Sequence, residues 1–565
     1  MTIFGFIQQS SAALKVAELG IQIVGNNVAN ANTPGYIRQE LVQQSAIGMK
    51  IGQFSLGYGV RATGVVQKVD SYLNERMRTT QSEMAKTNTL LESYTEFENF
   101  FSELSSEDIS TSMSEFANAF NDLTNQPGSD SLRTMVIERG KSLASEIRDK
   151  RTQMLELSQR YGKQITLAAD EINRITKQIG VLNTKIAEIE GSIDTGTQAV
   201  GLRDERLQLL EQLAGYISIK TSESETGTVS VFIGGDYLVA DGISRTVAAA
   251  QTSGEGRFNT EIILTDSQSA LKITGGSIGG MIEARDRVIQ GTLDQYDEFT
   301  KNLIDRVNFV HSQGQGAKGF SAVTSSRSVS SSSAVLEDAG LSRTVENGGF
   351  QIKTLDANSG LERTYDIPVQ LDGLPTDTNL FSLAQSISNI PGLSAIINEL
   401  NQIEIKAIAS TTTFSFQNDT SGALAALGIN TFFSGEDSSD IDINDVLKKD
   451  PSLLAVSLDG VGRTTRNANI LGEIFESPIP GLGDQSLRDQ YEALAIRMTQ
   501  DSNIEKGKNE GFKSYFATLE SKHLGQSGVN LDEEAVKLML YQKAYQASSR
   551  VIAISNELLT TLMQI

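Results

Sequence analysis

The feature that most constrains this chain is a long helical period in residues 147–193. Apolar side chains recur there at intervals of three and four, with Lys150 as the one polar interruption, which places them along one face of an α-helix. Such a helix would be on the order of 70 Å long at 1.5 Å per residue. We expect it to pair with another long helix, because its apolar face runs along its whole length. The residues that keep this period are Ile147, Met154, Leu157, Tyr161, Ile165, Ala168, Ile172, Ile175, Ile179, Leu182, Ile186, Ile189 and Ile193.

The N-terminal segment has the same period and then stops abruptly. An Asn-rich stretch leads into Thr33-Pro34-Gly35-Tyr36. Proline favours the first central position of a β-turn, and glycine permits the positive φ of the second position. We therefore predict that the first helix ends in a tight turn at Pro34 and Gly35. The residues that line one face of this helix are Ile7, Ser10, Leu14, Ala17, Ile21, Val24 and Val28.

The last predicted helix, residues 532–565, carries two apolar stripes. A helix in a two-stranded pair needs only one stripe, so two stripes indicate partners on two sides. Those partners are either the core of its own domain or neighbouring subunits of an assembly. The first stripe consists of Leu538, Tyr541, Tyr545, Ser548, Ile552, Ser555, Leu559 and Leu562. The second stripe consists of Leu540, Ala544, Ala547, Val551, Ile554, Leu558 and Ile565.

Between the helical parts the apolar period changes to two, which is typical of strands. YISIKTS, TVSVFIGG, EIILTDS and ALKITGG alternate in this way from Tyr216 onward. A second region contains the strand-like runs GGFQIKTL and TTTFSF and the helical run FSLAQSISNI. Helical patterns return at Met281–Gln313 and Leu487–Ser521, with a Gly-containing break at residues 525–528 before the last helix.

We therefore expect a mainly α, elongated multidomain protein with inserted β-rich domains and long heptad helices in its middle layer. At 565 residues the chain has room for several domains. The N- and C-terminal helices would pair. The expected segments are an N-terminal helix and turn (1–60), a long helical domain (61–215), a small β region (216–278), a further helix of the helical domain (279–315), a β-rich domain (316–430), a return to the helical domain (431–527) and a C-terminal helix (528–565).

Composition argues against most classes of enzyme and against nucleic acid as a partner. The chain has no cysteine, and its two histidines, His311 and His523, are expected at the surface or at helix ends. The formal net charge of −22 repels phosphate backbones. No apolar stretch is long enough to span a membrane, and MTIFGFIQQSSAALK lacks the features of a secretory signal. We expect no catalytic residue, no metal ligand and no cofactor.

Two short motifs suggest a ligand but occur in the wrong context. Gly314-Gln-Gly-Ala-Lys-Gly319 matches the GxGxxG dinucleotide pattern, yet it follows a predicted helix instead of a strand, so we expect a helix-ending loop. Asp440-x-Asp442-x-Asn444 resembles the start of a calcium loop, but its later positions lack the glycine and the glutamate that such a loop needs. We predict an acidic turn that caps a helix near Val446.

The two ends of the chain resemble one known family. NNVANANTPGY at residues 26–36 is similar to the N-terminal signature of the bacterial flagellar axial family, which comprises rod, hook and hook-associated proteins. GVNLDEEAVKLMLYQKAYQASSRVIAISNELLTTLMQI at residues 528–565 is similar to the C-terminal helix of that family. The interior run ALGINTFFSGEDSSDIDINDVLKKDPSLLAVS at residues 426–457 resembles the hook-associated members.

This resemblance implies a structural adaptor without catalysis that joins the flagellar hook to the filament. It would form a homo-oligomeric, ring-like layer, with the hook protein and a second junction protein, hook-associated protein 3, as partners. The family is secreted through the flagellar type III apparatus with an uncleaved signal, and its terminal helices form an inner tube while the β-rich domain faces outward. The resemblance also implies an export chaperone at the C-terminal helix.

The resemblance places the subunit and axial contacts on both terminal segments. The residues implied are Ile7, Leu14, Ile21, Val24, Asn26, Asn27, Asn30, Pro34, Gly35, Tyr36, Leu538, Tyr541, Tyr545, Ile552, Leu558, Leu559 and Leu562. The hypothetical chaperone-binding residues are Tyr545, Ile552, Leu558 and Leu559.

Three other interpretations are open. The nearest is another axial subunit, such as the hook or rod protein, although a hook protein is expected to lack the long helix of residues 147–193. A more distant one is a nucleotide-dependent enzyme that uses the loop of residues 314–319. The third is a coiled-coil receptor, which the absence of a predicted membrane span argues against.

Overall fold

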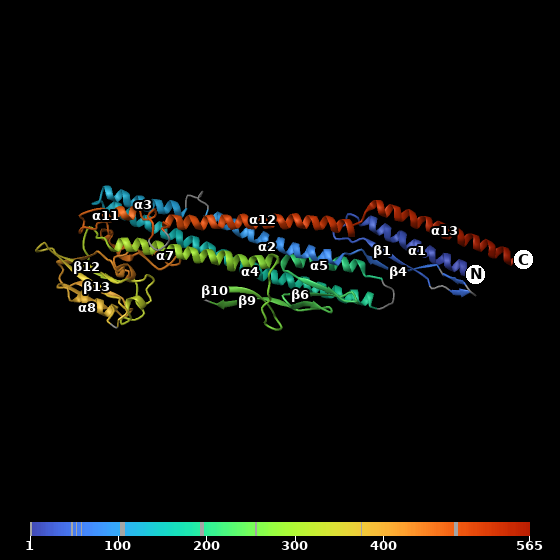
Figure 1. The fold of residues 1–565 in the computed structure, drawn as a ribbon, viewed down its shortest axis with the longest axis horizontal. Coiled ribbons are helices and arrows are strands. Elements are labelled where there is room, and N and C mark those ends of the chain that lie inside the picture. Colours follow the sequence, from blue (N-terminus) through green and yellow to red (C-terminus); the bar gives the residue numbers. More distant parts are fainter. Residues whose placement is uncertain are drawn as a thin grey trace. The chain divides into compact units, whose positions relative to one another are not determined.

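A computed structural model describes residues 3–46, 49–51, 54–57, 59–101, 108–191, 197–254, 257–374, 376–479 and 484–564 (Figure 1). The chain forms two compact units. The first consists of Met1–Ser93, Gln159–Arg285 and Ser502–Ile565, and the second of Tyr94–Ser158 and Asp286–Asp501. Among the described residues, no helix combines the length and the hydropathy that crossing a lipid bilayer requires.

The long helix predicted from the apolar period is confirmed as α4, which spans 61 residues from Asp130 to Glu190. In the first unit its Ile165, Ile172 and Ile179 are buried in one core with α5 and with strands of the small β region. The apolar face of this part of α4 therefore packs against a short helix and β-strands. The apolar period alone predicted a second long helix as its partner. Ile193, the last residue of the predicted period, lies outside the described residues.

Two asparagines of α4 fix the strands against it. Asn173 donates its amide N–H to the carbonyl oxygen of Val247 and accepts from the N–H of the same residue, both at 2.8 Å. Asn183 binds the backbone of Val229 in the same way, at 2.8 and 3.1 Å. Each amide satisfies both backbone groups of a strand residue, so the register of the strands on the helix is set by hydrogen bonds as well as by apolar packing.

The first unit also contains the two terminal helices and a set of small sheets. β1 pairs with β4 and β2 with β3, β5–β6–β7–β8 form one sheet, and β9 pairs with β10. The strands between residues 39 and 67 were not predicted from the sequence. The strand predicted for ALKITGG is absent: this segment forms only an isolated β-bridge at Ala270. The elements are α1 (Ile3–Ala29), β1 (Gln39–Ser45), β2 (Met49–Ile51), β3 (Phe54–Leu56), β4 (Val60–Gln67), α2 (Ser71–Phe101, shared with the second unit), α5 (Val200–Tyr216), β5 (Lys220–Glu223), β6 (Val229–Ile233), β7 (Asp236–Ala240), β8 (Ile243–Ser244), β9 (Val247–Gly254), β10 (Arg257–Leu264), α6 (Gly276–Glu283) and α13 (Leu531–Met563).

The second unit has a helical part with an aromatic core and a part made of two small sheets. Its largest buried side chains include Phe116, Phe120, Phe432, Phe433 and Phe475. The sheets have the strand orders β13–β12–β16 and β11–β15–β14, and the predicted strands GGFQIKTL and TTTFSF are neighbours in the first of them. The elements are α3 (Ile109–Asn125), α7 (Gln290–Ser312), β11 (Ala322–Thr324), a 3₁₀ turn (Leu336–Asp338), β12 (Gly348–Asp356), β13 (Leu361–Val369), α8 (Leu380–Ser388), β14 (Leu393–Ile397), β15 (Ile403–Ala407), β16 (Thr412–Gln417), α9 (Ala423–Leu427), β17 (Phe433–Ser434), β18 (Asp442–Ile443), α10 (Asp445–Lys449), a 3₁₀ turn (Pro451–Leu453) and α11 (Arg466–Gly472).

The helix expected over Met281–Gln313 is confirmed: a π-helical segment, Ala284–Ile289, joins α6 to α7 without a break, and the helix begins earlier, at Gly276. One predicted helix end is wrong. The helix expected to end at Ser521 continues as α12 (Leu487–Ser527), through Gly525. Packing along the rest of a helix offsets the low helix propensity of a single glycine, so the break before α13 comes only after Ser527.

His311 is fully buried, and the expectation that it lies at the surface is wrong. Its Nδ1 donates to the carbonyl oxygen of Asn430 at 2.8 Å, and its Nε2 accepts from the N–H of Ala455 at 3.1 Å. This pairing requires the neutral ring. Burial is the main cause that lowers the pKa of His311 to about 4. The end of α7 thus lies inside the core, because the chain after β16 folds over it.

Candidate functional site

The two terminal helices, α1 and α13, pack against each other along their length, as Figure 1 shows beside the labels N and C. They are antiparallel: Asn27 contacts Glu534, and Gly20 lies against Tyr541. A Cβ atom on Gly20 would lie 2.6 Å from the Tyr541 ring, so the absence of a side chain there lets the helices approach closely. The pairing of the terminal segments expected from the resemblance is therefore present within one chain.

The pair covers one stripe of α13 more than the other. Ser555 of the first stripe is buried, and Leu538, Ile552 and Leu559 are half-buried. In the second stripe Leu540, Ile554 and Leu558 are 61%, 58% and 53% exposed. α1 thus covers the first stripe in part, since Tyr545 and Leu562 of that stripe remain exposed. Most of the described second stripe is exposed, and Ile565 lies outside the described residues.

A group of polar residues, which we call the terminal clamp, joins the start of α13 to the segment after α1. It consists of Asn27, Tyr36, Arg38, Glu533 and Glu534. Arg38 Nε donates to Glu534 Oε1 at 2.8 Å, and Arg38 Nη1 donates to Glu533 Oε2 at 2.6 Å. The side chain of Glu534 is fully buried, whereas that of Glu533 is 59% exposed. The clamp therefore contains one buried ion pair and one exposed ion pair on the same guanidinium.

Asn27 uses the whole hydrogen-bonding capacity of its amide. Its Nδ2 donates to the carbonyl oxygen of Gln39 at 3.0 Å and to Glu534 Oε2 at 2.9 Å. Its Oδ1 accepts from the Tyr36 hydroxyl at 2.8 Å and from the N–H of Gln39 at 3.0 Å. One buried side chain thus connects α1, the turn, β1 and α13.

The charges in the clamp stabilise one another. Burial by itself lowers the pKa of Arg38, but its hydrogen bonds to Glu533 and Glu534 more than offset this and leave the pKa raised. The hydrogen bond from Arg38 lowers the pKa of Glu533. Burial, with smaller contributions from Asp204 and Glu534, raises the pKa of Tyr36 to about 12. At neutral pH the tyrosine is therefore a hydrogen-bond donor, as its contact with Asn27 requires.

The turn predicted after the first helix is confirmed. Gly35 has a φ of +76°, and the N–H of Tyr36 donates to the carbonyl oxygen of Thr33 at 3.2 Å. These are the features of a type II turn with proline and glycine at its centre. Gln208 of α5 donates to the carbonyl oxygen of Pro34 at 3.1 Å, so the turn is also tied to the rest of the first unit.

Gly35→Val should destabilise this turn by about 1–2 kcal/mol, the cost of placing a side chain with a Cβ in the left-handed region. The new side chain also collides with the Gln208 amide, because a Cβ atom at position 35 would lie against its Nε2. We expect faster amide exchange in α1 and at residues 36–46, with the second unit unchanged. Gly35→Asn is the matched control, because its Cβ meets Gln208 as that of valine does, whereas asparagine tolerates this backbone conformation. The difference between the two variants therefore isolates the backbone conformation, and an equal effect of both would refute the role assigned to the positive φ of Gly35.

The residues implied as axial contacts fall into three groups. Val24 and Asn27 are buried. Those half-buried are Ile7, Leu14, Ile21, Asn30, Tyr36, Leu538, Tyr541, Ile552 and Leu559. Those exposed are Asn26, Pro34, Gly35, Tyr545, Leu558 and Leu562.

Sequence reasoning missed the clamp residues Arg38, Glu533 and Glu534. Acidic residues in the first turn of a helix are common, because they interact with the helix dipole, so this run carried no sign of a distant partner. Asn530 caps α13 by accepting from the N–H of Asp532 at 3.0 Å and from that of Glu533 at 3.3 Å. The capping asparagine and the acidic run were visible in the sequence, but their pairing with Arg38 was not.

Both ligand-like motifs have structural roles. In the loop of residues 314–319, the N–H of Gln315 donates to the carbonyl oxygen of Ser457, and that of Ala317 donates to Ser452, both at 2.7 Å. These donors are therefore engaged by the protein's own backbone instead of facing a phosphate. In the acidic motif, Asn444 accepts from the N–H of Val446 at 3.1 Å and caps α10, as predicted.

Three family models match the chain. The helical domain of the flagellar hook-associated protein FlgK matches residues 94–323. The C-terminal domain of the flagellar basal body rod FlgEFG proteins matches residues 520–565. The flagella basal body rod protein model matches residues 9–36. The last two matches cover most of the terminal pair, α1 and α13.

Relatives match over nearly the whole length of the chain. It is 23% identical to flagellar hook-associated protein 1 of Escherichia coli K12, over 99% of each chain. It is 21% identical to flagellar hook-associated protein 1 of Bacillus subtilis 168, over 98% of this chain and 96% of the relative. The fold is similar to that of the flagellar hook junction protein FlgK from Burkholderia pseudomallei, with a TM-score of 0.51 and 14% identity over 80% of this chain and 99% of that structure. These matches agree with the paired terminal helices: the chain is similar to flagellar hook-associated protein 1 over nearly its whole length, and its residues 94–323 match the FlgK helical domain.

Proposed function

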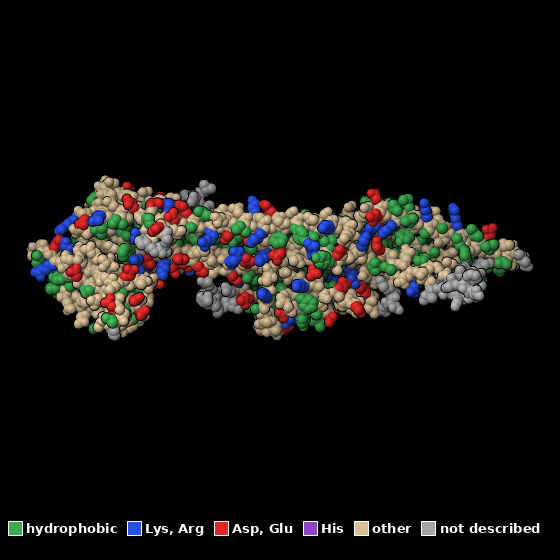
Figure 2. Space-filling model, in the orientation of Figure 1, with side chains coloured by type: hydrophobic (Ala, Val, Ile, Leu, Met, Phe, Trp, Pro, Cys, Tyr) green, Lys and Arg blue, Asp and Glu red, His purple; other side chains and the backbone are tan. Residues whose placement is uncertain are grey.

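We propose that this protein is a structural subunit of the bacterial flagellum that is exported to the hook–filament junction and assembles there with copies of itself. The observation that carries this function is the terminal pair: α1 covers much of one apolar stripe of α13, and most of the described second stripe remains exposed. In Figure 2, hydrophobic side chains lie on the surface over the region where Figure 1 places α1 and α13. A soluble protein rarely keeps such a row of apolar side chains exposed without a partner.

Neighbouring subunits in the axial structure are the partners proposed for the second stripe. Burying one leucine or isoleucine contributes about 1.5–3 kcal/mol, so several together support a specific interface. The hook protein would contact the subunit on one side, and the second junction protein, hook-associated protein 3, on the other. The role is mechanical and needs no catalysis.

The stripe is tested by replacing Leu540 and Ile554 together with aspartate. Both side chains are more than half exposed, so we expect the variant to fold with normal amide exchange in both units. We expect it to be exported but absent from the junction, with loss of filaments and of motility. The measurement is antibody labelling of isolated flagella in the electron microscope. The control replaces Leu400 and Ile408 of the second unit with aspartate; these residues are 68% and 72% exposed. Normal labelling of the first variant would exclude the stripe as an interface.

The proposed export chaperone would bind both stripes of α13. Its expected residues Ile552 and Leu559 lie on the side that faces α1, while Leu558 belongs to the second stripe. A chaperone that contacts all three must therefore replace α1 as the partner of α13. Chaperone binding and pairing of the terminal helices would then exclude each other.

A chain that ends near Gly528 should lose chaperone binding. The double variant Ile552→Asp with Leu559→Asp should weaken chaperone binding at least about a hundredfold, because two apolar contacts that the complex would bury are lost. The measurement is calorimetric titration with the candidate chaperone. Arg38→Met, which loosens the terminal clamp, should instead strengthen binding by making α13 available. Equal affinity of the full-length and truncated chains would show that α13 is not the binding site.

A further inference from the structure

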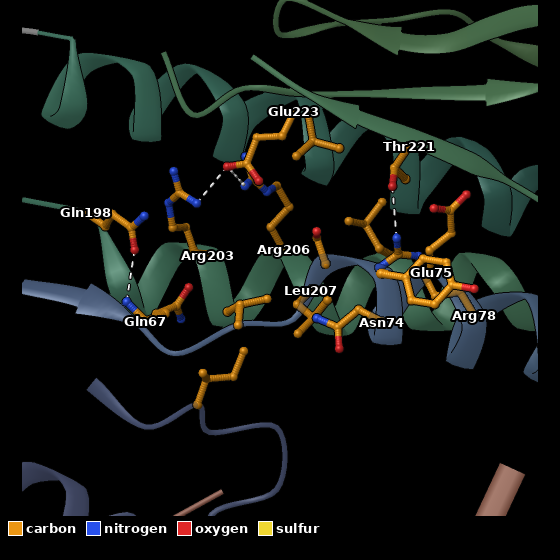
Figure 3. A pocket seen from close by; sticks show the side chains of 16 residues that line it. Gln67, Asn74, Glu75, Arg78, Gln198, Arg203, Arg206, Leu207, Thr221 and Glu223 are labelled. Atoms are coloured by element: carbon orange, nitrogen blue, oxygen red, sulfur yellow. Dashed lines mark hydrogen bonds and ion pairs between the residues drawn. The ribbon is translucent and has the colours of Figure 1, made fainter. Parts of the chain in front are cut away.

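A cavity of about 670 Å³ lies within the first unit, between α2, α5 and β5, and neither the terminal clamp nor the exposed stripe uses it. Figure 3 shows Arg203, Arg206 and Glu223 toward one end and Arg78 with Thr221 toward the other. Three arginines and two glutamates are among the residues that line it. The arginines outnumber the glutamates in this lining, whereas the chain as a whole has a net charge of −22.

The two arginines of α5 have partners within the protein. Arg203 binds Glu190 through Nε and Nη2, both at 2.7 Å, and Glu223 through Nη1 at 2.6 Å. Arg206 Nη1 donates to Asn183 Oδ1 at 2.9 Å and to the carbonyl oxygen of Gly227 at 2.6 Å. These side chains hold α5 against α4 and β5, so their presence at the cavity is explained by the fold.

Arg78 is different. Its residue is only 7% exposed, and its Nη2 donates to Thr221 Oγ1 at 2.9 Å. Its buried Nε has no hydrogen-bond partner, and no carboxylate of the described residues forms an ion pair with it. Burial lowers the pKa of Arg78, although the more distant Glu211 and Glu75 act in the opposite direction.

A buried cation without an ion-pair partner destabilises a folded protein, and an apolar side chain of similar length would cost less. Such a group is therefore a candidate for binding a ligand that supplies the missing charge. A guanidinium is suited to a carboxylate, which it binds through two parallel hydrogen bonds. Asn74, which is also buried, and Ser71 line the same cavity and offer further polar groups.

We propose that the Arg78 end of this cavity binds a carboxylate group. The carboxylate comes from a free small dicarboxylate or from an acidic side chain of a second copy of this chain. The second source rests on the proposed assembly, and the acidic composition of the chain favours it.

The first experiment titrates full-length protein with sodium succinate at constant ionic strength and measures binding by calorimetry and the melting temperature. We expect saturable binding that raises the melting temperature. Arg78→Met should weaken binding at least about tenfold, and Arg78→Lys, which keeps the charge without the planar donor pair, should also weaken it. Arg61→Met removes an exposed arginine of β4 and should bind as the native protein does. This experiment uses the free chain, so its result does not depend on the proposed assembly.

The second experiment measures self-association by sedimentation without succinate. If the carboxylate comes from a second copy, Arg78→Met should weaken self-association about tenfold, Arg61→Met should not, and added succinate should compete. Binding of succinate that depends on Arg78, without an effect on self-association, assigns the site to a free anion. If neither succinate binding nor self-association depends on Arg78, the proposal is overturned, and Arg78 serves only its contact with Thr221.

Discussion

Arg38→Met is expected to lower the free energy of unfolding of the terminal pair by about 3–5 kcal/mol, the range found when one partner of a buried ion pair is removed. Glu534 would then be fully buried without the guanidinium that binds it. Lys537 lies 4.0 Å from Glu534, too far to replace two short contacts. The measurement is amide exchange in α1 and α13 of the full chain, which should become faster while the second unit stays protected.

Two variants separate the buried ion pair from the exposed one. Glu533→Ala removes the partner that is 59% exposed, and we expect a loss of at most about 1 kcal/mol, as for surface ion pairs. Arg38→Met combined with Glu534→Gln removes both buried charges and should recover most of the lost stability, because no buried charge is left unpaired. If Glu533→Ala cost as much as Arg38→Met, the buried pair would not be the main contact between the ends of the chain.

The second unit is expected to lose about 3 kcal/mol of stability as the pH falls from 6.5 to 4, because His311 must remain neutral in the folded state. The folded-state pKa of about 4 lies below the ordinary value of 6.5. Between these values the unfolded chain binds more protons than the folded one. The contribution of neutral His311 to the free energy of unfolding is therefore complete above pH 6.5 and is lost progressively toward pH 4.

The test follows amide exchange in α7 and around Asn430 and Ala455 as a function of pH, in the full chain. His311→Gln should be less stable than the native protein at pH 7, since it loses at least one of two buried hydrogen bonds. Its stability should depend much less on pH between 6.5 and 4. His523→Gln, in the first unit, is the control and should leave the pH dependence of the second unit unchanged. Equal pH dependence of the native and His311→Gln proteins would contradict the assignment.

Local sequence patterns predicted the elements whose conformation depends on residues close together in the sequence. The long helix α4, the turn at Pro34 and Gly35, the cap at Asn444 and the two stripes of α13 were all predicted from residues within a few positions of one another. The strands between residues 39 and 67 were missed because their sequence does not alternate clearly. The predicted strand ALKITGG failed because apolar alternation alone does not supply a neighbouring strand with which to form hydrogen bonds.

The sequence by itself determined that both ends of the chain are amphipathic helices, that a turn follows the first, and that the last has more apolar surface than one partner helix can cover. The tertiary structure decided which stripe α1 covers, because that depends on the contact between Gly20 and Tyr541, two residues far apart in the sequence. It also decided that Arg38 pairs with Glu534 and that His311 lies in a core. Periodicity and turn propensity act between residues close in sequence, whereas burial and ion pairing depend on which distant segments the fold brings together.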